Sequence, residues 1–214
     1  MTKLSVLYED NHIIVVFKPA GFLSQGDKTG DEDMLTIIKK YLKEKYNKPG
    51  NVYLGLVHRL DRPVSGIMVF AKTSKAASRL SDEIRNNKMH KKYMAIVHGY
   101  LDEKEGTLRN KIEKIDNKKV VVDSPNGKEA ILNYKVIKEK NNLSLVDIDL
   151  VTGRYHQIRI QFANIKHPLY GDFLYNKKDS NPLALVSYSL SFIHPVTKEN
   201  MTFTLDSIEK YINL

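Results

Sequence analysis

The chain has 214 residues, of which 42% are hydrophobic and 28% are charged, an ordinary composition for a globular protein. It contains no cysteine, which excludes disulfides, thiolate zinc sites and cysteine nucleophiles and fits a cytoplasmic location. The 34 Lys and Arg residues outnumber the 25 Asp and Glu residues, so the formal net charge is +9. This excess predicts attraction to polyanions such as nucleic acids, although a generally solvated basic surface would have the same composition.

The first elements of the chain are predicted to be a buried strand followed by an amphipathic helix. Residues 12–17 form a continuous apolar run, as expected for a strand that is covered on both faces, and Lys18-Pro19-Ala20-Gly21 then signals a turn. Leu35, Ile38 and Leu42 follow at helical spacing. No apolar run approaches the roughly 20 residues that a membrane-spanning helix needs, and no secretory signal is apparent, so no membrane association is expected.

A second strand and a second helix are predicted next. Residues 66–72 form another buried apolar run, and Thr73 or Ser74 is placed to cap a following helix. The buried face of that helix is expected to consist of small and branched residues at helical spacing, namely Ala76, Ala77, Leu80 and Ile84.

From Lys91 onwards the sequence favours strands. Apolar side chains alternate with others at residues 93–97, 132–136 and 146–150, the pattern of antiparallel strands. Residues 120–122 precede Pro125-Asn126-Gly127, which predicts a hairpin turn.

The last third of the chain completes the predicted fold. Ile158, Phe162 and Ile165 mark a further helix, and residues 184–193 and 201–205 are expected to be strands separated by His194-Pro195. The whole pattern predicts one α+β domain over residues 1–214, built on a largely antiparallel mixed sheet flanked by helices.

The densest group of polar residues is His58-Arg59-Leu60-Asp61-Arg62-Pro63-Val64-Ser65-Gly66. An acid between two arginines, followed by Pro and Ser-Gly, indicates a shaped loop. Neighbouring positive charges favour the ionised carboxylate, and an ionised carboxylate in a phosphate-attracting cleft is what a nucleophile acting on RNA requires. An Asx-turn held by flanking salt bridges is the alternative interpretation.

This loop resembles the motif around the catalytic aspartate of the RluA-type RNA pseudouridine synthases. Two further blocks match in order: residues 91–99 are similar to the tyrosine-bearing strand of that family, and residues 152–159 resemble its third motif, with the usual sequel at residues 167–172. Residues 18–21 and the segment 128–134 are also similar to the family. One departure is Val64, where the family more often has threonine, although the carboxylate and its Ser-Gly turn are retained.

The resemblance extends from about residue 6 to about residue 205 and implies the catalytic fold of this family as a stand-alone domain without an S4 domain. The implied activity is isomerisation of specific uridines to pseudouridine in structured ribosomal RNA, transfer RNA or both, without a cofactor. The implied partner is therefore RNA, and a monomer is expected. A catalytically silent RNA-binding module or RNA-folding helper on the same scaffold is the alternative.

The same resemblance assigns catalytic roles to three residues. Asp61 would be the nucleophile, either attacking C1′ or assisting a glycal-like intermediate. Tyr93 would stack on the extruded base and assist removal of the C5 proton, unless it is simply a core tyrosine. Arg159 would pair with Asp61, with a solvated arginine as the alternative.

Further residues are expected to contact RNA. Arg59 is a candidate to fill the gap left by the extruded uridine, and the expected RNA path is lined by His58, Arg62, Arg154 and His156. His156, His167 and Asp172 do not have the spacing of a standard metal site, so no metal is expected. The lysine-rich segments 39–48 and 111–119 are either solvated faces or phosphate contacts.

Overall fold

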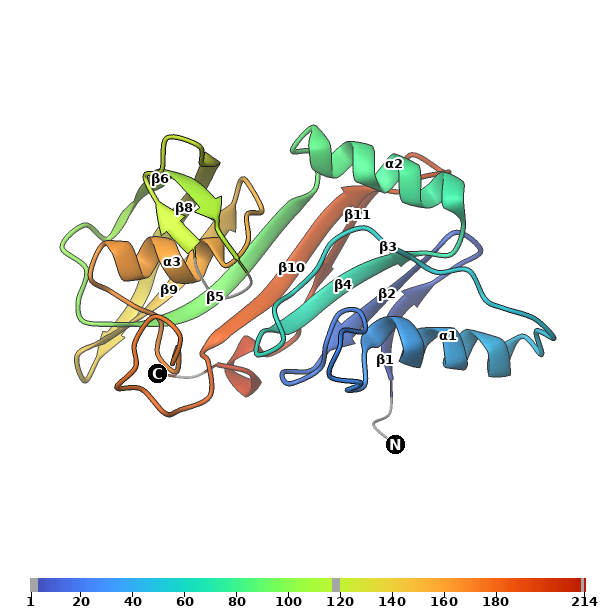
Figure 1. Ribbon diagram of the computed structural model, residues 1–214, viewed down its shortest axis with the longest axis horizontal. Coiled ribbons are helices and arrows are strands. Elements are labelled where there is room, and N and C mark those ends of the chain that lie inside the picture. Colours follow the sequence, from blue (N-terminus) through green and yellow to red (C-terminus); the bar gives the residue numbers. More distant parts are fainter. Residues whose placement is uncertain (1–3, 117–119, 213) are drawn as a thin grey trace. The chain divides into compact units, whose positions relative to one another are not determined.

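The computed structural model describes residues 4–116, 120–212 and 214. The chain forms two compact units (Figure 1), of which the first comprises Met1–Met89 with Ser189–Leu205 and the second His90–Tyr188 with Asp206–Leu214. Strand β10 (Leu185–Ile193) begins in the second unit and ends in the first. Since one catalytic domain can contain two lobes, the expected single domain over residues 1–214 stays a prediction.

The sheet of the first unit is built on the two apolar runs that predicted buried strands. Its strands are β1 (Ser5–Glu9), β2 (Ile13–Lys18), β3 (Gly55–Leu56), β4 (Ser65–Ala71), the end of β10 and β11 (Asn200–Thr204). They follow the order β1-β2-β4-β10, with β3 paired to β4 and β11 to β10. The antiparallel register of β2 and β4 places Val15 opposite Val69, and both side chains are fully buried. Both apolar runs are therefore buried strands, as predicted.

Two capped helices belong to the first unit, α1 (Met34–Lys45) and α2 (Ser74–Arg85). The Asp33 carboxylate accepts a hydrogen bond from the Thr36 amide, and the Thr73 hydroxyl accepts one from the Ala76 amide, each at 3.1 Å. These bonds satisfy amide groups that a helix start otherwise leaves without partners. The residues buried on the two helices are Met34, Ile38, Leu42, Ala76 and Leu80, while Leu35, Ala77 and Ile84 are half-buried.

The second unit is an antiparallel sheet with one α-helix. Its elements are β5 (His90–His98), β6 (Glu105–Lys114), β7 (Val120–Val122), β8 (Lys128–Lys140), β9 (Leu143–Leu150), α3 (Gln157–Asn164), the start of β10 and a 3-10 turn, η1 (Ile208–Lys210). The strand order is β5-β9-β8-β6-β7, and each of these pairs is antiparallel. Helix α3 packs against β6 and β7.

The hairpin predicted at Pro125-Asn126-Gly127 is wrong. Strand β7 pairs with β6 and not with β8, because Ile112 of β6 is opposite Val122 on one side and Lys128 on the other. A tight turn is present, with the Gly127 amide donating to the Ser124 carbonyl at 3.0 Å, but it leads the chain across β6. A side chain at Gly127 would come within 2.7 Å of the Lys111 backbone, so this glycine permits the crossing.

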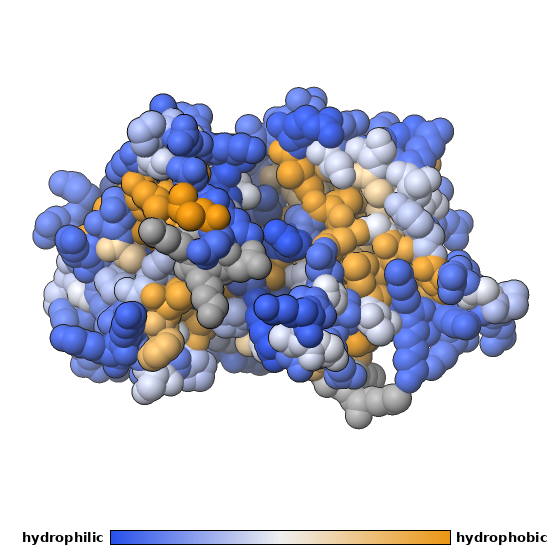
Figure 2. Space-filling model, in the orientation of Figure 1, coloured by the Kyte–Doolittle hydropathy of each residue, from blue (hydrophilic) through white to orange (hydrophobic). Residues whose placement is uncertain are grey.

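The α+β class and the largely antiparallel sheet are confirmed. Hydrophilic side chains cover much of the visible face of each unit (Figure 2). Within the described residues, no helix combines the length and the apolar character that crossing a membrane requires.

Candidate active site

Asp61 lies on the loop between β3 and β4 of the first unit, and the residue before it is fixed by Ser24. The Leu60 amide donates to the Ser24 hydroxyl at 3.1 Å, and this hydroxyl in turn donates to the Leu60 carbonyl at 2.8 Å. Ser24 is 5% exposed, so both bonds are shielded from water. A turn bond from the Val64 amide to the Asp61 carbonyl, 3.0 Å long, then shapes the loop after the acid.

The residue after Asp61 is fixed by Lys18, which is fully buried at the end of β2. The Lys18 ammonium donates to the carbonyl oxygens of Pro19 at 3.0 Å, Phe22 at 2.8 Å and Arg62 at 3.2 Å. The Gly21 amide reaches the same Arg62 carbonyl at 2.8 Å. The backbone on both sides of Asp61 is therefore anchored to the segment that follows β2.

Lys18 also contributes charge beside Asp61. Burial lowers the pKa of Lys18 to about 8, the Asp61 carboxylate opposes this change and Arg62 adds to it. The positive charge near Asp61 thus includes a buried ammonium besides the arginines that the sequence suggested. The sequence predicted a turn at residues 18–21 and a similarity of this segment to the family, but not a buried cation. A lysine directly at the end of an apolar strand and before proline is the signal that suggests a buried cation here.

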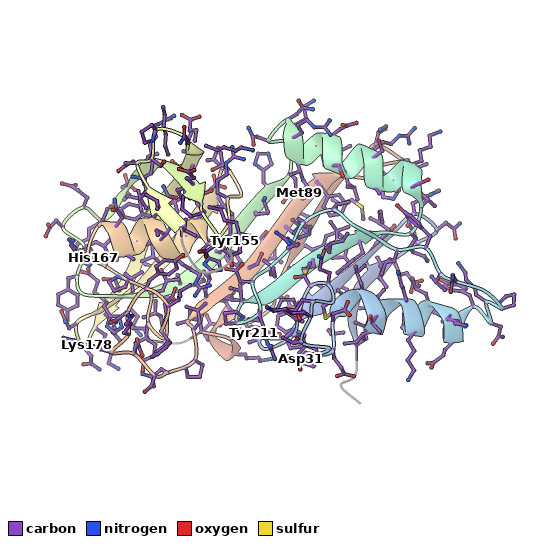
Figure 3. The ribbon with its side chains drawn as sticks, in the orientation of Figure 1. Asp31, Met89, Tyr155, His167, Lys178 and Tyr211 are labelled. Atoms are coloured by element: carbon purple, nitrogen blue, oxygen red, sulfur yellow. The ribbon has the colours of Figure 1, made fainter. Side chains whose placement is uncertain are left out.

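The predicted RNA-contacting residues of this loop differ in their surroundings. His58 is half-buried, and its Nε2 accepts a hydrogen bond from the Val69 amide at 3.1 Å, which ties the loop to β4. Arg62 is exposed, but it donates to the Gly21 carbonyl at 3.0 Å and pairs with Asp31 at 2.7 Å (Asp31 is labelled in Figure 3). Arg59 is exposed and makes no ion pair with another described residue. Arg59 is therefore the cation of this loop that is best placed to meet a polyanion.

Tyr93 lies on β5 of the second unit, opposite Ile148 of β9, and is 6% exposed. Lys91 precedes it by two residues, so the two side chains share one face of the strand. A Cβ atom on Gly153 would lie 3.2 Å from the Lys91 ammonium, which places that ammonium against the Thr152–Arg159 motif. Burial lowers the pKa of Lys91. Lys91 is a further cation beside the predicted site that the sequence did not single out.

Arg159 is on α3 and is 7% exposed, which excludes the solvated arginine considered from the sequence. Its Nε and Nη2 donate to the two carboxylate oxygens of Asp172, each at 2.7 Å. From the sequence, Asp172 was considered only as a metal ligand, which was not expected, and as part of the family-like segment 167–172. The expected pairing of Arg159 with Asp61 stays a prediction.

Arg154 and His156 precede α3. Arg154 is exposed, and its Nε donates to the Glu129 carbonyl at 2.9 Å. His156 is 9% exposed, and its ring stacks on that of Tyr155 with centroids 3.8 Å apart (Tyr155 is labelled in Figure 3). The Lys114 ammonium lies 4.4 Å from the Tyr155 centroid. His156 is thus a buried member of an aromatic group, and Arg154 is the more accessible of the two predicted contacts.

The predicted site residues fall into two groups in the structure. The loop of the first unit carries His58, Arg59, Asp61 and Arg62, and the second unit carries Tyr93, Arg154, His156 and Arg159. The family model for RNA pseudouridylate synthase matches residues 12–164, which include all eight. This chain belongs to the RNA pseudouridylate synthase family.

Curated relatives agree with this family. The chain is 33% identical to a ribosomal large subunit pseudouridine synthase C of Buchnera aphidicola subsp. Baizongia pistaciae, over 97% of this chain and 69% of the relative. It is 35% identical to an uncharacterised RNA pseudouridine synthase of Bacillus subtilis, over 92% of this chain and 66% of the relative. The chain spans about two thirds of the length of these relatives.

The fold is shared with solved structures. Human RNA Pseudouridylate Synthase Domain Containing 4 superposes with a TM-score of 0.79 at 22% identity, over 94% of this chain and 88% of that one. Human RNA Pseudouridylate Synthase Domain Containing 1 superposes with a TM-score of 0.74 at 20% identity, over 96% and 84%. The predicted family, its class of isomerase and its fold are therefore confirmed.

Proposed function

We propose that this chain converts specific uridines of structured RNA to pseudouridine, with Asp61 as the nucleophile and without a cofactor. The reaction breaks the bond between C1′ and N1 and joins C1′ to C5. The C5 proton leaves and N1 gains a proton, so substrate and product have the same composition and no oxidant or reductant is consumed. Asp61 either attacks C1′, as the carboxylate of a retaining glycosidase does, or assists a glycal-like intermediate.

The fixed backbone around Asp61 is the observation that carries this proposal. Ser24 holds both backbone groups of Leu60, and Lys18 holds the Arg62 carbonyl. A nucleophile held in one geometry before substrate arrives reduces the reorganisation that the reaction needs. A loop with only a structural role would not need an acid that is anchored on both sides within a basic environment.

Tyr93 and Arg159 are proposed to complete the chemistry. Tyr93 would stack on the extruded uracil and assist removal of the C5 proton, while Arg159 would pair with Asp61. Extruding a base from folded RNA costs a few kcal/mol. The exposed Arg59 would offset part of that cost by filling the gap left in the stack.

The proposed substrate is ribosomal RNA or transfer RNA, recognised by shape more than by linear sequence. The net charge of +9 supports binding to either polyanion. Because the Buchnera relative is named a ribosomal large subunit enzyme, ribosomal RNA is the first substrate to test. We expect the protein to act as a monomer in the cytoplasm.

Release of tritium from RNA labelled at C5 of uridine tests the proposal. Unmodified ribosomal RNA and transfer RNA are incubated separately with wild type, with Asp61→Asn and with Asp82→Asn, an exposed acid of α2 paired with Arg85. We expect release by wild type and Asp82→Asn and none by Asp61→Asn. Absence of release by wild type from both RNAs, with salt-sensitive binding retained, would instead favour the silent RNA-binding module.

A further inference from the structure

The guanidinium of Arg159 is held on two sides by residues of the segment that follows α3. Asp172 accepts two parallel hydrogen bonds of 2.7 Å from Nε and Nη2, and the two side chains are 8% and 0% exposed. The ring of Tyr175 lies on another side, with its centroid 5.4 Å from the Arg159 Cζ atom. A planar guanidinium that is paired along one edge and placed over an aromatic ring has little rotational freedom.

Tyr175 also connects this pair to His156. The Tyr175 hydroxyl and Nδ1 of His156 share a hydrogen bond of 2.9 Å, and the two rings meet edge to face at 88°. His156 has a left-handed backbone, with φ of 54°, directly before α3. That conformation is uncommon for a residue other than glycine and is kept only where surrounding contacts support it. Tyr175 thus supports both the start of α3 and the arginine one turn further along it.

Asp172 and Tyr175 are themselves fixed by a compact turn. The Asn176 amide donates to the Asp172 carbonyl at 2.7 Å, and the Leu174 amide donates to the Asp172 carboxylate at 3.2 Å. Tyr175 packs against a buried cluster that consists of Ile112, Ala130 and Ile160. The two residues that contact Arg159 are therefore held by hydrogen bonds and packing within the second unit.

The ion pair with Asp172 uses only one edge of the Arg159 guanidinium. A guanidinium has five N–H donors, and Asp172 accepts from Nε and Nη2 of Arg159 along one edge. The ion pair neutralises a buried charge and fixes the direction of the remaining donors. An arginine that must meet a carboxylate or a developing charge in one geometry benefits from such fixation, since a displacement of about 1 Å can reduce a rate by about 100-fold.

We propose that Asp172 and Tyr175 are positioning residues for the isomerisation, because they orient the guanidinium of Arg159 without contacting the RNA. The inference rests on the proposed function of Arg159. Loss of either residue should lower kcat with little change in KM, since RNA binding depends on other cations. A residue with a merely structural role would lower the folded fraction and leave kcat per folded molecule unchanged.

The experiment compares Asp172→Asn and Tyr175→Leu with a matched control in the tritium-release assay. Glu139→Gln is that control, because Glu139 is an acid of the second unit that pairs with Lys104 at 2.9 Å and lies on β8, outside the segment that carries Asp172. We expect a fall in kcat of about 100-fold for Asp172→Asn and about 10-fold for Tyr175→Leu, with KM within about 3-fold. Glu139→Gln should keep the wild-type kcat per folded molecule, with the folded fraction of each variant measured by circular dichroism.

A double-mutant cycle with Arg159→Lys decides whether the two residues act through Arg159. In the Arg159→Lys background, Asp172→Asn and Tyr175→Leu should each lower kcat by less than about 3-fold further, because the guanidinium that Asp172 and Tyr175 orient is absent. Wild-type kcat in both folded variants, or losses that multiply fully with Arg159→Lys, would overturn the inference. If Asp172→Asn fails to fold, Tyr175→Leu and its cycle decide alone. An inactive wild-type protein would instead count against the proposed function.

Discussion

The Lys18 ammonium lies 3.2 Å from the carbonyl oxygen of Arg62, so the end of β2 is bonded directly to the residue that follows Asp61. The two residues are 44 positions apart in the sequence. This bond makes a fully buried cation part of the support of the proposed nucleophile. Two consequences of the contact can be measured.

Replacement of Lys18 by methionine should reduce both stability and activity. The variant keeps the side-chain volume but removes the ammonium donor from three partly buried carbonyl groups, of which that of Arg62 keeps another bond, from the Gly21 amide. The loss should cost about 2–4 kcal/mol of unfolding free energy. Urea unfolding measures that loss. Lys72→Met is the matched control, since the Lys72 side chain is 9% exposed and pairs with Glu9 at 2.8 Å. Lys72→Met should also be less stable, but only Lys18→Met should lose kcat per folded molecule.

Raising the pH through about 8 should lower activity while the contribution of Lys18 to stability rises. The pKa of Lys18 is lowered by burial to about 8, whereas an unfolded lysine titrates near 10.5. Between these values the unfolded state binds more protons, so the contribution of Lys18 to stability increases with pH. Deprotonation of the Lys18 ammonium removes a positive charge beside Asp61, and kcat/KM should therefore fall. The pH profile of Lys18→Met should lack this alkaline fall, and a fall of the same size in Lys18→Met would refute the assignment.

Local patterns predicted most of the elements but not the contacts between them. The apolar runs identified β2 and β4, and helical spacing identified α1 and α2, because the burial of a strand or of a helix face determines which nearby residues are apolar. The bonds of Ser24 and Lys18 to the loop of Asp61 join residues 36 and 44 positions apart, which no local pattern records. The wrong hairpin prediction has the same origin, because β7 pairs with β6 and this pairing is not visible in the residues next to the turn.

The site was predicted through motifs, and these gave residue types without their partners. The resemblance identified Arg159, but it did not reveal that Asp172 and Tyr175, on the segment after α3, contact this arginine. Arg62 was expected on the RNA path, yet its guanidinium is bonded to Gly21 and Asp31. Side-chain partners of this kind depend on long-range packing, so sequence spacing alone does not reveal them.

Gly171→Ala should disrupt the segment that carries Asp172. Gly171 has a φ of +78°, and a Cβ atom there would lie 1.9 Å from the Pro182 carbonyl oxygen, which is backbone and cannot move alone. We expect a loss of about 3 kcal/mol or more in unfolding free energy. Gly50→Ala is the control, because a Cβ atom at Gly50 meets nothing within 4 Å. Equal stability of the two variants in urea would show that the turn relaxes at little cost.

Acid should weaken the first unit through Glu9. Burial would raise the pKa of Glu9, but hydrogen bonds from Lys45, Lys72 and two tyrosines lower it to about 2. A lowered folded pKa stabilises the protein above the unfolded value of 4.5, and this contribution disappears as the pH falls from 4.5 towards 2. Its size is about 3 kcal/mol. Glu9→Gln should lose that amount at pH 7 in chemical unfolding and show a weaker loss of stability between pH 5 and pH 3 than wild type.

The lysines of α1 offer a test of where RNA is bound. Lys39, Lys40 and Lys43 are exposed, and none forms an ion pair with another described residue, whereas Lys45 pairs with Glu9 at 2.7 Å. We predict that the three unpaired lysines contact phosphates, because their charge is not already neutralised. Each lost contact should reduce the slope of log affinity against log salt by about one, so the triple change to Gln should reduce it by up to about three.

Filter binding of ribosomal RNA between 50 and 300 mM salt would measure these slopes, and Lys45→Gln serves as the matched change on the same helix. Lys45→Gln should leave the slope unchanged, because its charge is already balanced by Glu9. An unchanged slope in the triple variant would mean that α1 is a solvated face and that RNA binding uses other cations. A reduced slope with an unchanged kcat at saturating RNA would place α1 in substrate binding and separate it from the chemistry of Asp61.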